Sequence, residues 1–455
     1  MSANLLSLLD VGAAGIAAQN AGVAVATNNV ANASTPGYSR ETVDFNAQLG
    51  PPLLGGVTTS DPTRIASELL ASRMRSSSGS LSMSTASSSA LSDLEDTMTA
   101  GPTIDTQLAA LFGNIAQANA SPSSSVTRSA VVQSVRDVAT SVHDEANAVA
   151  QAQGQANQRI SDNVKQASQL AAQLASLNKQ VAQSHDPAAA DQRDQVAQQL
   201  AGLVGGTARV DPDGQMRFVL DGGAVLVDGA HAATLQTAPD ATTGFADVQV
   251  VDGGTTRDVT QQIGGGSVGA DISFRDGTAA TAASQLDQLA YDIATSFNGV
   301  STQNAAADGS TGNAMFVAPT QVKGAAAALE IDPSLDADPS KLALAAAGQP
   351  AGDNTGGLAL FALSNQTVAS GGTKTLTNSS LDILGNVGQA VANANNDVTR
   401  DQTVNAGLSQ LQDSLSGVDT NEELTNLARF QNTSQAMTKF VSTINEMLSN
   451  LIENL

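Results

Sequence analysis

The chain of 455 residues contains no cysteine and no tryptophan, and only 3% of its residues are aromatic. Without cysteine, no part of the protein depends on redox state, so either side of a membrane is permitted. With so few aromatic residues, any core must be built mainly from Ala, Val and Leu. Such residues suit long helices packed closely side by side better than one thick globular core.

Positive charge is also scarce, because 20 basic residues face 43 acidic ones and the formal charge is −23. An acidic surface repels phosphate backbones, so we expect no nucleic-acid partner. The first basic residue is Arg40, which leaves no basic region for a secretory signal. Asp10 interrupts the only apolar run, and we expect no window long enough for membrane insertion. Taken alone, these features indicate a cytosolic protein.

Residues that could carry catalysis or hold a metal are not grouped in the sequence. The three histidines, His143, His185 and His231, lie far apart and have no partner in ligand spacing. The segment Asp211–Gly214 begins like a calcium loop but lacks its closing Glu, which favours a β-turn. We therefore expect no active site, no metal site and no cofactor, and we predict that the protein is not an enzyme.

A ladder of apolar residues follows residues 427–455 in alternating steps of three and four. It comprises Leu427, Phe430, Ser434, Met437, Val441, Ile444, Leu448, Leu451 and Leu455. The first thirty residues carry a similar ladder with smaller side chains: Leu5, Leu9, Gly12, Ile16, Gln19, Val23, Ala26 and Val30. This alternation is typical of a coiled-coil seam, and such a seam needs a partner helix to cover it.

Two interpretations of the ladders are open. The two helices could pack on each other inside one globular fold, or they could form a surface for assembly. We favour assembly because a helix of about 35 residues spans roughly 50 Å, which is long for an average domain. The alternation also persists to the last residue, where globular chains usually fray.

Helical periodicity also accounts for most of the chain between the ladders. We expect a helix to start at Pro62 and a weak helix to cover the Ser-rich segment 76–90. A helix of about sixty residues is expected from 121 to a break at 185–187, followed by a helix over 188–203. Helical periodicity resumes over 286–297, and a long helix is expected over roughly 380–415. Residues 39–59 and 308–357 indicate extended or loop structure. Asp419 is expected to cap the last helix, with Glu422 reaching back to its amide.

The period changes from 3.6 to 2 in the middle of the chain. Short β-type runs at 215–220, 224–227 and 248–251 are separated by Asp- and Gly-rich turns. The sequence therefore predicts a mainly α protein with an inserted β domain, an α+β multidomain chain. We expect a terminal coiled-coil assembly domain (1–34 with 419–455), a helical core (35–205 with 270–418) and an outer β domain (206–269).

Two motifs at opposite ends of the chain carry a resemblance to a known family. Residues 28–40 read Asn-Asn-Val-Ala-Asn-Ala-Ser-Thr-Pro-Gly-Tyr-Ser-Arg, and Pro36-Gly37 fits a type II turn. This segment is similar to the N-terminal signature of bacterial flagellar rod, hook and hook-associated proteins, with the turn motif at Asn32, Thr35, Pro36, Gly37 and Tyr38. Residues 426–431 and 442–448 resemble the closing helix of the same group.

The internal layout resembles one branch of that group, the hook-associated protein 1 family. Long-helix pattern precedes the β runs, and segments match the family in order: 190–194, 273–275, 285–289 with 297–298, and 352–354. Another axial protein, such as a hook or rod subunit, would share both terminal motifs and is the main alternative. A secreted adhesin with its site in 207–268 is a more distant one.

The resemblance implies a structural subunit of the bacterial flagellum at the junction between hook and filament. Its expected place is extracellular, reached by flagellar type III export without a cleaved signal. Its implied partners are further copies of itself in a ring, the hook protein, the adjacent hook-associated junction protein and an export chaperone. The expected assembly interface comprises Leu5, Leu9, Ile16, Val23, Val30, Leu427, Phe430, Met437, Val441, Ile444, Leu448, Leu451 and Leu455. The chaperone is expected to bind Val441, Ile444, Leu448 and Leu451.

Overall fold

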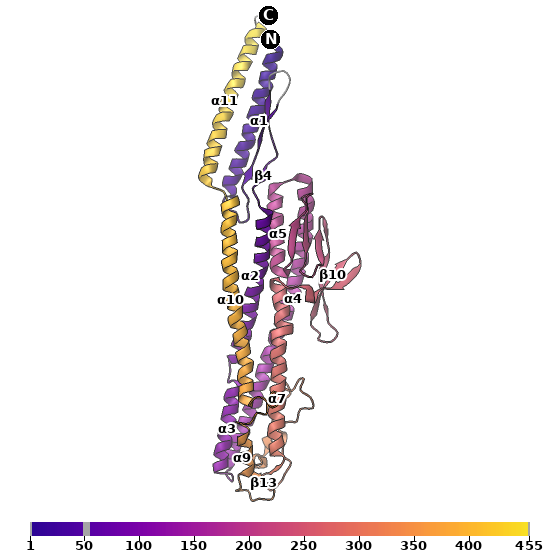
Figure 1. Ribbon diagram of the computed structural model, residues 1–455, viewed down its shortest axis with the longest axis vertical. Coiled ribbons are helices and arrows are strands. Elements are labelled where there is room, and N and C mark those ends of the chain that lie inside the picture. Colours follow the sequence, from indigo (N-terminus) through magenta and orange to yellow (C-terminus); the bar gives the residue numbers. More distant parts are fainter. Residues whose placement is uncertain (1, 49–54, 454–455) are drawn as a thin grey trace.

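The computed structural model describes residues 2–48 and 55–453, and it is a long helical rod from one end of which the two terminal helices project together (Figure 1). The helices are α1 (Ser2–Asn32), α2 (Glu68–Thr99), α3 (Ile104–Ala120), α4 (Ser125–Ser184), α5 (Pro187–Val204), α6 (Gly266–Ser273), α7 (Ala279–Ser301), α8 (Pro333–Ala337), α9 (Thr355–Ala362), α10 (Leu376–Ser416) and α11 (Thr420–Glu453). A π-helical turn, Phe274–Thr278, joins α6 to α7. The prediction of a mainly α fold with an inserted β domain is confirmed.

The longest helix, α4, begins and ends at residues suited to those positions. The Ser124 hydroxyl accepts a hydrogen bond from the Thr127 amide at its start. His185 takes a left-handed conformation (φ 52°) at its end, and the Asp186 carboxylate then caps α5 with Pro187 in its first turn. The predicted sixty-residue helix and its break at 185–187 are confirmed.

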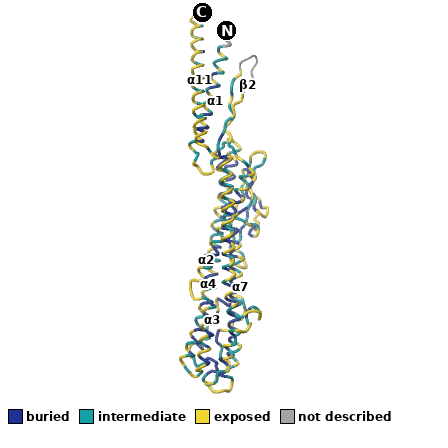
Figure 2. The backbone as a smooth tube through the Cα atoms, turned by 60° about the vertical axis from the view of Figure 1, so that its left-hand side comes forward, coloured by how far each residue is buried: buried dark blue, intermediate teal, exposed yellow. Residues whose placement is uncertain are grey.

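Two apolar cores lie along the rod, and α4 contributes to both. The first joins α4 to α2, α3, α7 and α10 around fully buried side chains such as Leu108, Leu289 and Phe297. The second joins α4 and α5 to the β insertion around Leu174 and Phe218. Buried residues follow the axis of the rod, whereas the terminal helices are mostly intermediate or exposed (Figure 2). Each fully buried apolar side chain of this kind contributes about 1.5–3 kcal/mol.

The β insertion consists of two small antiparallel sheets on one side of α4 and α5 (Figure 1). One sheet holds β5 (Thr207–Val210), β6 (Met216–Val219), β7 (Val225–Asp228) and β8 (His231–Ala232); the other holds β9 (Thr234–Pro239), β10 (Ala246–Asp252) and β11 (Thr255–Asp258). The buried Asn178 amide of α4 donates to the carbonyls of Met216 and Gly229 and fastens the first sheet. The three predicted runs correspond to β6, β7 and β10, and the sequence pattern misses the other strands.

The segment before α2 differs from its prediction. Two short antiparallel pairs precede the helix: β1 (Glu41–Thr42) with β4 (Thr63–Arg64), and β2 (Phe45–Gln48) with β3 (Gly56–Thr59). The helix start predicted at Pro62 is therefore wrong, because the next two residues are held in β4. The helix begins instead at Glu68, where the Ser67 hydroxyl caps it. The Ser-rich segment 76–90 lies inside α2, so its predicted helical state is confirmed.

Residues 304–362 form the loop-rich end of the rod that the sequence predicts. They contain α8, a 3-10 turn (Pro339–Lys341), α9 and one strand pair, β12 (Asn304–Ala305) with β13 (Ala345–Ala346). A second 3-10 turn, Thr260–Gln262, closes the β insertion.

The expectation that no segment is apolar enough to cross a membrane needs correction. By length and composition alone, residues 5–32 of α1 pass such a test. A helix that packs against a partner passes the same test, and α1 lies along α11 (Figure 1). The apolar side chains of α1 therefore contribute to its packing against α11.

Candidate assembly interface

The two terminal helices pack against each other through holes on α1 and bulky side chains on α11. A Cβ atom placed on Gly12 would lie 2.5 Å from Cγ2 of Val441, and one on Gly15 would lie 3.1 Å from Cε of Met437. One on Gly22 would lie 3.0 Å from three ring carbons of Phe430. At Gly12 a side chain would force a neighbouring atom to move, and at Gly15 and Gly22 the space is tighter than a side chain usually has, so glycine at these positions lets α11 approach the backbone of α1.

The predicted interface residues of α11 all lie on the side that faces α1. Ile444 is buried, and Leu427, Phe430, Met437, Val441, Leu448 and Leu451 are half-buried. Leu455 lies outside the described residues. The C-terminal ladder is thus in contact with the N-terminal helix of the same chain, as in the first of the two interpretations considered above.

On α1 the buried positions include Gly12 and Ala26 of the predicted ladder, but none of the large apolar residues predicted for the interface. Leu5, Leu9, Ile16, Val23 and Val30 are half-buried, beside the contact line. The buried positions are Gly12, Gly15, Ala18, Gly22, Val25, Ala26 and Asn29. The pattern of large apolar residues does not reveal Gly15, Ala18 and Gly22, because their small side chains do not stand out as apolar in the sequence. The periodic spacing of Gly12, Gly15 and Gly22 was the available signal.

The β2–β3 hairpin covers another side of the pair. The Cβ position of Gly56 on the hairpin lies 3.7 Å from Cβ of Ala14 on α1. The ring of Phe45 lies 5.7 Å from the ring of Phe430 on α11, centroid to centroid. The hairpin therefore touches both helices, and it leaves the opposite side of the pair open.

The turn motif that follows α1 folds the chain back onto that helix. Gly37 has a φ of 77°, and the Tyr38 amide donates to the Thr35 carbonyl at 3.2 Å, so the predicted turn is confirmed. The Tyr38 hydroxyl then donates to Oδ1 of Asn29 at 2.8 Å. The Asn29 side-chain amide also donates to the Glu41 carbonyl and accepts from the Glu41 amide, each at 2.9 Å. These two bonds hold the returning chain against α1.

Burial also sets the protonation of this network. It raises the pKa of the Tyr38 phenol, and the Glu41 and Asp191 carboxylates raise it further. Tyr38 therefore stays a hydrogen-bond donor to Asn29. Burial likewise raises the pKa of the Glu41 carboxyl.

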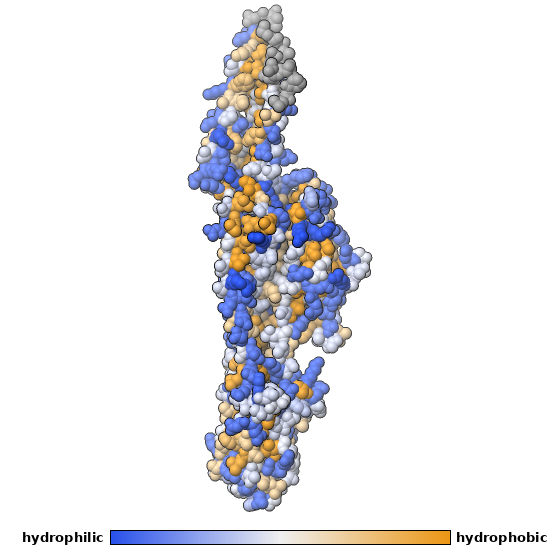
Figure 3. Space-filling model, viewed as in Figure 1, coloured by the Kyte–Doolittle hydropathy of each residue, from blue (hydrophilic) through white to orange (hydrophobic). Residues whose placement is uncertain are grey.

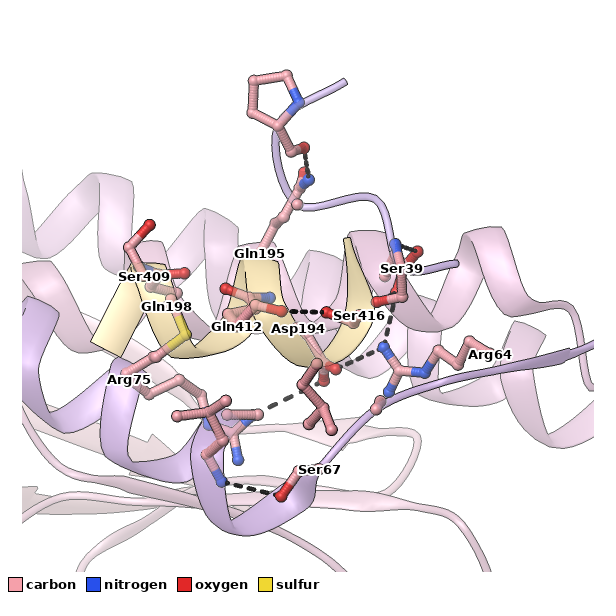
Figure 4. A pocket seen from close by; sticks show the side chains of 18 of the residues that line it. Ser39, Arg64, Ser67, Arg75, Asp194, Gln195, Gln198, Ser409, Gln412 and Ser416 are labelled. Atoms are coloured by element: carbon pink, nitrogen blue, oxygen red, sulfur yellow. Dashed lines mark hydrogen bonds and ion pairs between the residues drawn. The ribbon is translucent and has the colours of Figure 1, made fainter. Parts of the chain in front are cut away.

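Residues 36–64 also join the terminal pair to the rod. Asp191 of α5 accepts 2.8 Å bonds from the Ser39 amide and hydroxyl and from the Arg64 guanidinium. The Arg64 guanidinium also pairs with Asp194 at 2.7 Å (Figure 4). The amide of Gln195 donates to the Pro36 carbonyl at 2.6 Å. A cavity of about 500 Å³ lies between this cluster, α2 and α10. We call these contacts the joint.

Arg40 completes the joint at the start of α11. Its guanidinium pairs with Glu422 at 2.6 Å and with the buried Glu423 at 2.7 Å, and its amide donates to the Ser416 carbonyl. The hydrogen bond to Glu422 is the main cause of the raised pKa of Arg40. Asp419 caps α11 through the amides of residues 421 and 422, as predicted. The expected return bond from Glu422 is wrong, because that carboxylate turns to Arg40 instead.

The polar residues considered for chemistry lie apart in the structure. His143 contacts the Ala327 carbonyl, His231 contacts Asp252, and His185 ends α4. Across residues 2–48 and 55–453, no group of three or more His, Asp or Glu side chains has the arrangement of a metal site. The ion pairs and hydrogen bonds described above thus join helices to one another and the projection to the rod.

Comparisons with known proteins agree with this architecture. Residues 91–316 match the family described as flagellar hook-associated protein FlgK helical domain, and residues 9–38 match the flagella basal body rod protein family. Flagellar hook-associated protein 1 of Escherichia coli is 23% identical and the alignment covers 98% of this chain and 99% of that protein. The protein of the same name from Bacillus subtilis is 24% identical, with 97% and 96% covered.

A solved structure shares the fold. The flagellar hook junction protein FlgK from Burkholderia pseudomallei superposes with a TM-score of 0.69 at 14% sequence identity, over 76% of this chain and all of that one. The helical-domain match, the two nearly full-length relatives and this shared fold all agree with the resemblance found in the terminal motifs. The chain therefore belongs to the flagellar hook-associated protein 1 family, whose members are structural proteins of the hook–filament junction in the external flagellum.

Proposed function

We propose that this chain builds the hook–filament junction through contacts between its terminal helix pair and neighbouring copies. The observation that carries the proposal is the projection itself, which leaves the rod with both chain ends at its tip (Figure 1). Among residues 2–48 and 55–453, the β2–β3 hairpin is the element that covers a side of the projection. The remaining surface of the projection keeps large apolar side chains in water, namely Leu424, Phe440, Met447 and Ile452 of α11. Such surface is stabilised when another helix covers it.

The open side of the pair combines residues from both helices. Phe440 and Met447 each precede a residue of the C-terminal ladder, so they form a stripe directly beside it. The Phe440 ring also lies 3.3 Å from the Cβ position of Gly12 on α1. The half-buried Leu9 and Ile16 of α1 flank that point. A neighbouring helix laid along this side would cover all four side chains.

Helix α1 is almost uncharged, because Asp10 is its one charged side chain. Like charges oppose the approach of identical subunits, so the exposed flank of α1 offers little repulsion to a second copy.

The same apolar residues explain the further partners that we propose. Before the pair forms, Val441, Ile444, Leu448 and Leu451 are exposed on a separate helix, which favours an export chaperone that covers them. Export would use the flagellar route without a cleaved signal. In the junction, the chain would contact the hook protein on one side and the adjacent hook-associated junction protein on the other. The role is structural rather than enzymatic, and it needs neither nucleic acid nor membrane insertion.

Deletion of the gene tests the proposed place in the flagellum. We expect bare hooks and monomeric flagellin lost to the medium. Missing hooks would instead make the chain a rod or hook subunit, the alternative named above. Intact filaments with normal swimming would refute the proposal and return attention to the β insertion.

A point variant tests the role of the terminal pair. Leu448→Asp places a charge on the face of α11 that meets α1, and we expect loss of junction assembly and weaker chaperone binding. Ser449→Asp adds the same charge on the exposed side of the same turn and is the matched control. Wild-type motility with Leu448→Asp would show that this face is not needed for assembly.

A further inference from the structure

Helix α10 changes the character of its inward face along its length. In the half far from the projection this face is apolar and belongs to the first core, through Leu376, Ile383, Val387, Val391 and Ala394. Past Ala394 the buried residues of α10 are Asp401 and Ser416. The residues turned toward α2 and the cavity at the joint are polar there: Asn405, Ser409, Gln412 and Ser416. We call them the polar ladder and residues 404–416 the near segment.

The large apolar side chains of the near segment are largely exposed to water. Leu411 is 58% exposed, Val404 50% and Leu415 47%, and Leu408 is half-buried. Figure 3 shows hydrophobic residues gathered on the part of the rod next to the projection. Each of the four stands one position before a residue of the polar ladder. The near segment therefore carries two parallel ladders, and the polar one faces the rod.

Two hydrogen bonds between α2 and α10 give the register of the near segment. Ser77 bonds to Asn405 and Ser88 to Asn395, so the two helices run antiparallel. Residues 70–74 of α2 consequently lie opposite the middle of the near segment.

The cavity of about 500 Å³ at the joint has an apolar wall there. Leu70 and Met74 line it from α2, whereas Ser409 and Gln412 line it from α10 (Figure 4). The charged residues of the cavity are already held in ion pairs, with one another or with Glu68. Apolar side chains thus face polar ones across the cavity, while the apolar ladder of α10 stands one position away in water.

We propose that the near segment turns about its own axis and docks its apolar ladder into this cavity. Neighbouring residues of a helix are about 100° apart, so a turn of nearly that size exchanges the two ladders. A 3-10 stretch of four residues supplies about 80° of it, because each residue then turns by about 120°, and it lengthens the helix by about 2 Å. Residues 396–403 are suited to this change, since Asn, Asp, Val and Thr, which are weak helix formers, predominate there.

The turn connects the packing of α10 to the joint. It breaks the bond between Ser77 and Asn405, and it releases the Arg40 amide from the Ser416 carbonyl at the end of α10. In exchange it takes the apolar ladder out of water. Helix α10 thus has two packings, and the turned one loosens a contact between the rod and the projection. The inference concerns the single chain and goes beyond the proposed function.

The absence of cysteine allows each packing to be trapped by a disulfide. Ser77→Cys is combined with Asn405→Cys for the described packing and with Val404→Cys for the turned one. Ala406→Cys is the matched control, because residue 406 flanks Asn405 on the other side. Val404 and Ala406 are exposed, and cysteine is close to serine in size, so the fold is retained.

The rate of disulfide formation in the purified full-length chain is the readout. We expect the pair with Val404→Cys to form at least about tenfold faster than the pair with Ala406→Cys, the ratio that ~1.4 kcal/mol gives. Ser88→Cys with Asn395→Cys lies before the turning residues and verifies that the oxidation works. If that disulfide forms while the Val404 and Ala406 pairs react equally slowly or equally fast, the turn does not occur. Either result leaves the proposed function to its own tests.

Discussion

The glycine contacts between α1 and α11 make a sharp prediction at Gly12. Replacing glycine by alanine inside a helix ordinarily stabilises it by about 1 kcal/mol, because the unfolded chain loses freedom. At Gly12 the new Cβ would lie 2.5 Å from Cγ2 of Val441. A valine on a helix has essentially one side-chain rotamer, so this methyl group cannot turn away. The helices must separate, and overpacking of this kind costs about 1–3 kcal/mol.

The clash therefore outweighs the propensity gain, and we expect Gly12→Ala to destabilise the terminal pair or leave it unchanged. Gly154→Ala in α4 is the control, because a Cβ there meets nothing within 4 Å and only the gain of about 1 kcal/mol applies. The free energy of local opening, measured by amide hydrogen exchange in residues 2–32 and 420–453, reads out the first variant. The exchange of residues around 154 reads out the control.

A second substitution separates the clash from other effects. Val441→Ala removes the methyl group that Gly12→Ala would strike, so the double variant should be more stable than the two single effects predict, by about 1–3 kcal/mol of coupling. Zero coupling, or a Gly12→Ala variant that gains as much as Gly154→Ala, would refute the close approach of α11 to α1 at this position.

Two further predictions concern the rod and the joint. Burial raises the pKa of the Glu145 carboxyl to about 7, although its carboxylate accepts a hydrogen bond from the Ile104 amide. Because this pKa is higher in the folded chain than in the unfolded chain, the free energy of unfolding is greatest near pH 4 and falls as the pH rises through 7. Unfolding midpoints between pH 5 and 8 should decline in the wild type and be flatter in Glu145→Gln; equal slopes would contradict the assignment. Asp191→Asn removes the charge shared by Ser39 and Arg64 and should cost roughly 1–3 kcal/mol, with faster proteolysis at residues 36–42 as the readout. Unchanged cleavage would show that the joint does not depend on Asp191.

The parts of the fold that the sequence predicts correctly rest on local signals. The ladder from Leu427 to Leu451 is periodic over several turns and identifies the face of α11 that meets α1. Pro36-Gly37 specifies its turn through backbone geometry alone. The break after α4 follows from Asp186-Pro187, which both caps and starts the next helix. In each case, a few neighbouring residues contain the whole physical reason for the structure.

The parts that the sequence misses depend on contacts between distant residues. Ser39 meets Asp191, and Arg40 meets Glu422, across separations that no periodic pattern reveals. The β2–β3 hairpin is fully exposed along β2 and carries no alternating pattern. The buried face of α1 is glycine-rich, and the ladder of apolar side chains identifies that face only in part, at Gly12 and Ala26. The helix start at Pro62 fails for a related reason, because pairing with β1 overrides the local preference.

The joint sets the orientation of the projection relative to the rod. Copies that meet through their terminal pairs can pack regularly only if every projection leaves its rod at the same angle. The buried Asp191 carboxylate between Ser39 and Arg64 and the buried Glu423 beside Arg40 supply charged contacts that are lost together if the projection tilts. Removing one partner from a buried pair is costly because the other charge stays unpaired. Loosening the joint should therefore weaken assembly without altering the apolar surface of the terminal pair, which distinguishes the role of the joint from that of the surface.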